Sequence, residues 1–144
     1  MPSDETIKLL KECNAGVKMA VTSINEVTDK VQNKELLSLL ERFLKEHQQI
    51  EEETHNELNA YKDTEKSPNP IAEAMASAKI NIKFLTNSTD QEIAELMIDR
   101  CNMGIKSVSR YINQYPTATQ QVKDLCEKLI KLEQRFMDEL RIYL

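Results

Sequence analysis

Ionisable and amide side chains occur at positions that helical periodicity turns toward an apolar core. Counting about 100° per residue places His47 at the centre of the apolar stripe of its helix and Glu51 on the flank of that stripe. Glu133, 86 residues after His47, again lies among apolar residues, and Asn14 and Asn102 occupy inward positions of two further helices. We therefore expect Asn14, His47, Asn102 and Glu133 to form one polar layer across the middle of the core.

Such a layer has two interpretations. Polar groups that converge inside an apolar bundle are costly to bury, so they can mark a metal or small-ligand site. In that case His47, Glu51 and Glu133 would hold a single Fe, Mn or Zn ion, and Asn14 and Asn102 would contact a bound cofactor or ligand. The alternative is a hydrogen-bond network that sets the register of the helices, as buried Asn does in coiled coils.

Under the second interpretation His47 and Glu133 form the central interaction. An adjacent carboxylate favours the imidazolium, so the two side chains would share a charge-assisted hydrogen bond. Acid–base chemistry would need further groups, and no nucleophile, oxyanion hole or phosphate-binding glycine loop accompanies the pair in the sequence. The residues thus favour a non-catalytic protein over an enzyme.

Helices are predicted to position these residues, and no strand pattern of period two appears. A first hairpin covers residues 4–62, with Ser3 and Asn33 as the caps of its two helices. Asn69 and Pro70 begin a crossover helix at 70–86. A second hairpin at 90–143 opens on the capping box Thr89-Asp90-Gln91-Glu92 and turns at Tyr115-Pro116-Thr117 into a helix that starts at about Thr117. The fold class is therefore all-α, a four-helix bundle in one domain of residues 1–144.

Composition narrows the class of protein further. With 30% charged and 40% hydrophobic residues in 144, the chain is typical of a globular domain. A net charge of −5, with basic and acidic residues interspersed, disfavours nucleic acid as a partner. No apolar run approaches the roughly 20 residues of a membrane span, and the polar start lacks a leader pattern. We therefore expect a cytoplasmic protein without a membrane partner.

A short internal repeat supports the two-hairpin arrangement. Cys13-Asn14-Ala15-Gly16 returns as Cys101-Asn102-Met103-Gly104, 88 residues later, whereas the following helices align at an offset of 86. We assign the difference of two residues to the hairpin loop. Two equivalent hairpins joined by a crossover predict a bundle with an approximate internal twofold axis.

On its topology and this Asn-x-Gly element, the chain resembles the ferritin-like superfamily. Within it the chain is similar to a family of uncharacterised bacterial ferritin-like domains of unknown function. The resemblance implies a ferritin-like four-helix bundle of two helical hairpins joined by an additional crossover helix. In active members it also implies two metal ions, held by a Glu from each of two helices and a Glu-x-x-His pair from each of the other two.

The ligand set implied by the resemblance is incomplete in this chain. Asn14 and Asn102 stand near where ferritin-like enzymes would have Glu, and amide oxygens do not supply the charge that neutralises two metal ions. In the Glu-x-x-His sequence of residues 52–55, Glu52 projects about 140° from the stripe. We therefore expect no dinuclear site and favour a structural or protein-interaction bundle without a cofactor, with a single-ion or small-ligand site as the alternative.

Both glycines lie inside predicted helices, where each costs about 1 kcal/mol relative to Ala. Each belongs to a stripe of mostly small residues, namely Leu9, Cys13, Gly16, Ala20, Ser23 and Val27, and Met97, Cys101, Gly104, Val108, Tyr111 and Tyr115. One crossover helix cannot easily cover both stripes. The uncovered one would be an interface, which predicts a twofold homodimer. The alternative is that a centrally placed crossover buries both stripes within the monomer.

Overall fold

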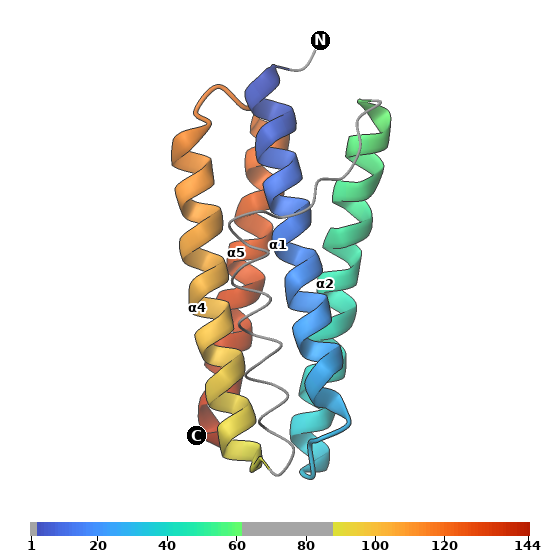
Figure 1. The fold of residues 1–144 in the computed structure, drawn as a ribbon, viewed down its shortest axis with the longest axis vertical. Coiled ribbons are helices and arrows are strands. Elements are labelled where there is room, and N and C mark those ends of the chain that lie inside the picture. Colours follow the sequence, from blue (N-terminus) through green and yellow to red (C-terminus); the bar gives the residue numbers. More distant parts are fainter. Residues whose placement is uncertain (1–2, 62–87) are drawn as a thin grey trace.

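The computed structural model describes residues 3–61 and 88–144, which form four α-helices packed side by side (Figure 1). They are α1 (Asp4–Thr28), α2 (Lys34–Ala60), α4 (Asp90–Gln114) and α5 (Gln120–Leu140), and a short 3₁₀ helix, η1 (Arg141–Tyr143), follows. No strand occurs in these two segments. The predicted all-α class and the four-helix bundle are confirmed, whereas the crossover helix predicted at 70–86 lies outside the described residues.

Side-chain caps set where the helices begin. The Ser3 hydroxyl accepts a hydrogen bond from the backbone of α1, Asn33 caps α2, and Thr89 forms a reciprocal capping box with Glu92 at the start of α4, all as predicted. The cap of α5 is Thr119. The start predicted at about Thr117 is therefore three residues early, because the turn after α4 continues to residue 119.

An acidic side chain in the first turn of each hairpin holds the loop of the other hairpin. The carboxylate of Asp90 accepts hydrogen bonds from the backbone N–H groups of Gln32 and Asn33, at 3.0 and 2.9 Å. At the opposite end the carboxylate of Glu5 accepts from both the hydroxyl and the backbone N–H of Thr117, and these bonds lower the pKa of Glu5. An acidic side chain thus joins the two hairpins at each end of the bundle.

The two hairpins match in their first helices and in their loops, whereas α2 has 27 residues and α5 has 21. α1 and α4 begin and end 86 residues apart, α2 and α5 begin 86 residues apart, and both hairpin loops, 29–33 and 115–119, contain five residues. The expectation that the hairpin loop absorbs a two-residue difference is therefore wrong. Instead, Cys101 lies two residues deeper in α4 than Cys13 lies in α1.

The direction of the helices separates this bundle from a simple up-down-up-down arrangement. In Figure 1, α1 and α5 run in one direction, whereas α2 and α4 both run in the other. The end of α2 and the start of α4 consequently lie at opposite ends of the bundle. Residues 62–87 connect these two ends.

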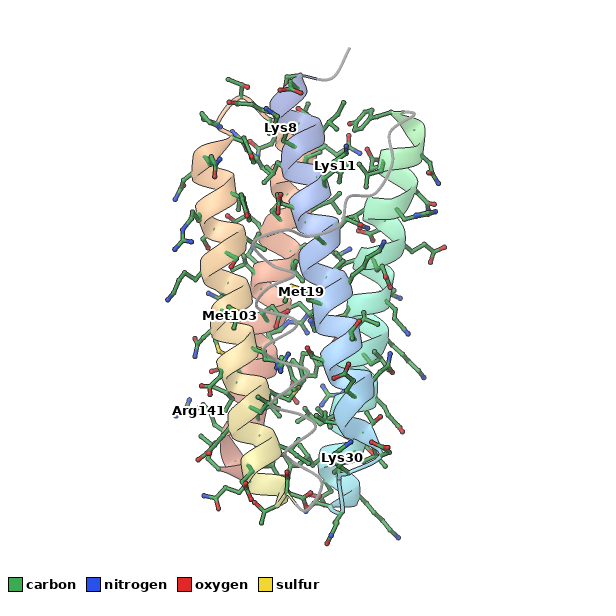
Figure 2. The ribbon with its side chains drawn as sticks, in the orientation of Figure 1. Lys8, Lys11, Met19, Lys30, Met103 and Arg141 are labelled. Atoms are coloured by element: carbon green, nitrogen blue, oxygen red, sulfur yellow. The ribbon has the colours of Figure 1, made fainter. Side chains whose placement is uncertain are left out.

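The core is apolar and its edges are charged. The rings of Phe43 and Phe136 stack at 4.7 Å between α2 and α5. Outside this contact, Arg42 pairs with Glu139 and Lys128 with Glu53 across the same two helices, and charged side chains cover the outside of the bundle (Figure 2). Among the described helices, none is long and apolar enough to cross a membrane.

The two small-residue stripes face each other, not solvent. A Cβ atom added to Gly16 would contact Val108 of α4 and Leu129 of α5. The other members of the two stripes are buried or half-buried. The exposed surface on which the homodimer prediction depended is therefore absent from both stripes, while the homodimer itself stays a prediction.

We expect Asp90→Ala to lower the free energy of unfolding by about 1 kcal/mol, because two backbone N–H groups lose a charged acceptor and the N-terminus of α4 loses a negative charge. Urea unfolding followed by circular dichroism measures the change. Asp99→Ala, an exposed acidic residue of the same helix, is the control. Equal midpoints for the two variants would contradict the role given to Asp90.

Candidate functional site

The strongest polar feature of the core is a hydrogen bond between His47 of α2 and Glu133 of α5. His47 Nε2 lies 3.0 Å from Glu133 Oε1. His47 is fully buried and Glu133 is 6% exposed. The other ring nitrogen, His47 Nδ1, lies 2.6 Å from the backbone carbonyl oxygen of Phe43, one turn earlier in the same helix. The imidazole therefore uses both of its nitrogens within the fold.

These partners determine where the protons are. A carbonyl oxygen only accepts, so Nδ1 must carry a proton and donate it to Phe43. A bond between Nε2 and Oε1 then needs one further proton, either on the imidazolium or on the carboxylic acid. In both cases the His47–Glu133 pair shares one proton and is neutral overall, which is the state that an apolar core tolerates.

Aromatic rings enclose the pair on one side. The His47 and Phe136 rings pack edge to face, with their centroids 5.9 Å apart, and Phe136 in turn stacks on Phe43. The guanidinium groups of Arg42 and Arg135 lie over the Phe43 ring, at 5.1 and 5.9 Å. Water is therefore kept from this part of the α2–α5 seam, and the hydrogen bond acts in a low dielectric.

A second buried polar contact joins α1 to α2. The amide nitrogen of Asn14 donates to the Thr54 hydroxyl at 2.9 Å, and that hydroxyl donates to the backbone carbonyl of Glu51. Thr54 lies seven residues beyond His47, about 10 Å along the helix. Asn14 thus faces the core as predicted, but it does not join His47 in one layer.

The prediction that Asn102 belongs to the polar layer is wrong. Its side chain is exposed, although Asn14, its counterpart in the repeat, is fully buried. In α4 the Cys101 thiol already faces the hairpin partner α5, where Glu133 acts on it electrostatically. The next residue, about 100° further round, then turns to solvent. In α1 the Cys13 thiol instead contacts Cys126 of α5, so the next residue turns toward α2.

The three predicted metal ligands do not meet. His47 and Glu133 are in contact, whereas the contribution of Glu51 to the polar core is its backbone carbonyl, which accepts from Thr54. Within residues 3–61 and 88–144, no group of three or more His, Cys, Asp or Glu side chains is arranged to hold a metal ion.

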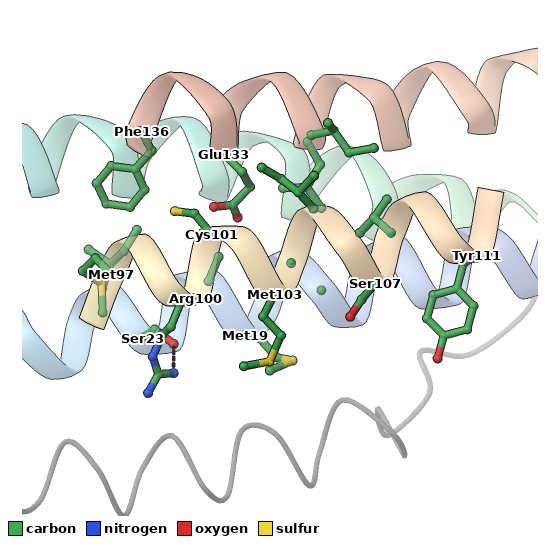
Figure 3. A pocket seen from close by; sticks show the side chains of 18 of the residues that line it. Met19, Ser23, Met97, Arg100, Cys101, Met103, Ser107, Tyr111, Glu133 and Phe136 are labelled. Carbon is green, nitrogen blue, oxygen red and sulfur yellow. Dashed lines mark hydrogen bonds between the residues drawn. The ribbon is translucent and has the colours of Figure 1, made fainter. Parts of the chain in front are cut away.

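A cavity of about 190 Å³ lies beside the pair, between α1, α4 and α5 (Figure 3). Its wall is mostly apolar and includes both glycines of the chain, Gly16 and Gly104. Glu133 and Cys101 contribute polar atoms on the α5 side, and Arg100 and Ser23 do so where α4 meets α1. The cavity therefore extends from the buried His47–Glu133 pair to the half-buried guanidinium of Arg100.

Arg100 is the functional candidate that the sequence reasoning missed. Its guanidinium donates to the Ser23 hydroxyl at 2.7 Å, and burial lowers its pKa. Among the described residues, its Nε has no hydrogen-bond partner, and none of the ion pairs within 4.0 Å involves it. The sequence signal was available but weak, since Ser23 belongs to one stripe and Arg100 directly precedes Cys101 of the other.

These features define a class of protein, an all-α four-helix bundle with a buried His–Glu pair beside a cavity. Within that class, the chain belongs to the family described as a domain of unknown function (DUF2383), whose family model matches residues 5–114. The match ends with α4, so Glu133 in α5 lies beyond it. No curated protein matches the chain, and no solved structure does. Membership of an uncharacterised family is thus confirmed.

We predict that Glu133→Ala lowers the free energy of unfolding by about 3 kcal/mol, because it leaves His47 Nε2 buried without its partner. Glu133→Gln should be milder, since an amide N–H can donate to a neutral imidazole. Urea unfolding measures both. The control is Glu127→Ala, which removes an exposed carboxylate from the same helix. A loss in Glu133→Ala no larger than in the control would contradict the structural role of the pair.

The buried thiols give a pH prediction. Burial, and then the Glu133 carboxyl, raises the pKa of Cys101, while the hydrogen bond with Cys13, and then burial, raises the pKa of Cys126. The folded state therefore keeps protons that the unfolded state releases above about pH 8.5. Stability should be complete below that pH and fall above it, by about 1.4 kcal/mol per pH unit for each thiol.

Urea unfolding at a series of pH values between about 7.5 and 10 measures this slope. The Cys101→Ala variant isolates the contribution of one thiol, because its slope should be shallower than that of the parent chain. The same slope in both chains would show that Cys101 does not remain protonated in the fold.

Proposed function

We propose that this chain is a non-catalytic, ferritin-like bundle with a structural or protein-interaction role in the cytoplasm. The observation that carries the proposal is the closure of the polar core. Both nitrogens of His47 are engaged, by Phe43 and by Glu133. An enzyme of the ferritin-like type needs carboxylate and imidazole groups that are free to bind metal or transfer protons.

Two features support the ferritin-like part of the proposal. α2 and α4 run in the same direction (Figure 1), as a single long crossover between two hairpins requires. The equal loop lengths and the constant offset of 86 residues between the helix starts of the two hairpins agree with an internal twofold arrangement.

The alternative is a bundle that binds a single metal ion or a small ligand in its core. The cavity beside Glu133 favours the ligand form of this alternative. A metal ion at His47 would have to displace the proton between Nε2 and Oε1 and to recruit ligands from beyond the pair.

A homodimer belongs to the same proposal, with a second copy as the partner and no nucleic acid or membrane involved. Its interface would have to lie away from the two small-residue stripes. Exposed large apolar side chains are found at Met103 of α4 and at Ile142 and Leu144 near the end of the chain. These are single side chains and do not form a stripe.

Metal analysis of the full chain, purified without chelator, tests the proposal. We expect less than one equivalent of iron, manganese or zinc in total, and no rise in thermal stability when any of these ions is added. A bound ion stabilises the folded state by an amount that grows with the logarithm of its concentration divided by its Kd. The measured metal content and the change in thermal stability on adding the ion should therefore lead to the same conclusion.

One equivalent of a metal that is retained on dialysis would overturn the proposal if His47→Ala and Glu133→Ala both lose it. The Glu51→Ala variant completes the design, because it removes the third ligand of the single-ion alternative. Loss of metal in all three variants would establish the site predicted as the alternative.

A further inference from the structure

We propose that the cavity between α1, α4 and α5 binds a small organic anion, a carboxylate with an apolar body, and that Arg100 holds its charged end. Nothing in the family description assigns such a site. The inference deepens the small-ligand alternative given above by naming the class of ligand, and the metal analysis described there does not decide it. Three observations support it, namely the glycines of the wall, the incomplete pairing of Arg100 and the composition of the cavity.

The glycines are not explained by close helix packing. A Cβ atom at Gly16 would lie 3.7 Å from Val108 and 3.8 Å from Leu129, and one at Gly104 would lie 3.9 Å from Glu133 Oε1. These are ordinary contact distances, so alanine fits at both positions. Glycine inside a helix is unfavourable relative to alanine. What the two glycines do provide is open space, because both line the same cavity.

Arg100 supplies a positive charge whose hydrogen bonds are incomplete. Its guanidinium is partly buried at the cavity wall, beside the Ser23 hydroxyl (Figure 3). The Nε–H lacks an acceptor in the part of the chain that the structure describes. Glu26 is close enough to act on the guanidinium electrostatically, but it is not within ion-pair distance. An oxyanion is the natural complement of such a group, because guanidinium and carboxylate bond in a matched geometry.

The rest of the cavity fits an uncharged apolar body. Met19, Met97 and Met103 contribute flexible thioether side chains that adapt to a ligand. Glu133 does not repel an anion there, since it shares one proton with His47 and the pair is neutral. An apolar cavity of about 150 Å³ takes benzene. A volume of about 190 Å³ therefore suits a medium-chain or single-ring carboxylate.

Titration of the full chain with octanoate, followed by isothermal calorimetry and by NMR of the methionine methyl groups, tests the proposal. We expect saturable binding, with shifts at Met19, Met97 and Met103, which line the cavity. Arg100→Gln should weaken binding at least about tenfold, as loss of a charge-assisted hydrogen bond implies. Arg141→Gln, which removes an exposed guanidinium that does not line the cavity, should leave octanoate binding unchanged. Octanol, the uncharged analogue, should bind more weakly than octanoate.

The Gly104→Ala variant gives a second and independent readout. It should raise the midpoint of urea unfolding and also weaken octanoate binding, because the added methyl group occupies the cavity. Binding that is equally strong in Arg100→Gln and in the parent chain would overturn the proposal. So would the absence of saturable binding, equal binding of octanol, or a lowered unfolding midpoint in Gly104→Ala.

Discussion

The hydrogen bond between His47 and Glu133 constrains the rest of the bundle, because it buries two ionisable groups in a mostly apolar core. Such groups are tolerated only as a neutral, fully bonded unit. The unit needs the Phe43 carbonyl behind the imidazole and the Phe43–Phe136 stack beside it. Both conditions hold in only one register of α2 against α5. The same register brings together the charged pairs along the edges of these helices, such as Arg42 with Glu139.

The pair was predictable from the sequence, whereas its surroundings were only partly so. His47 and Glu133 stand at inward positions of helices with a clear apolar period, and periodicity is the most dependable signal in a single chain. The caps at Ser3, Asn33 and Thr89 were predictable for a similar reason, since side-chain capping is a local interaction. The rotation of a helix about its own axis, in contrast, depends on how the helix packs against distant parts of the chain. It separates Asn14, buried against Thr54, from Asn102, which is exposed.

The same limit applies to the cavity. A stripe of small residues predicts that another element approaches closely, and the sequence cannot say how closely. The structure gives Gly16 and Gly104 ordinary contact distances, with room left beside them. Arg100 was missed because a single arginine near the edge of an apolar stripe is usually solvated. Only the arrangement of α1 against α4 shows that its guanidinium lies against Ser23 at the wall of a cavity.

The central claim is that His47 and Glu133 form a closed pair sharing one proton. Nitrogen-15 NMR of the imidazole in the metal-free chain tests this directly. The account predicts a proton on His47 Nδ1, protected from exchange by its bond to Phe43, and a second protected proton between Nε2 and Glu133. A His47 ring whose Nδ1 carries no proton, or whose protons exchange as fast as those of an exposed histidine, would contradict it.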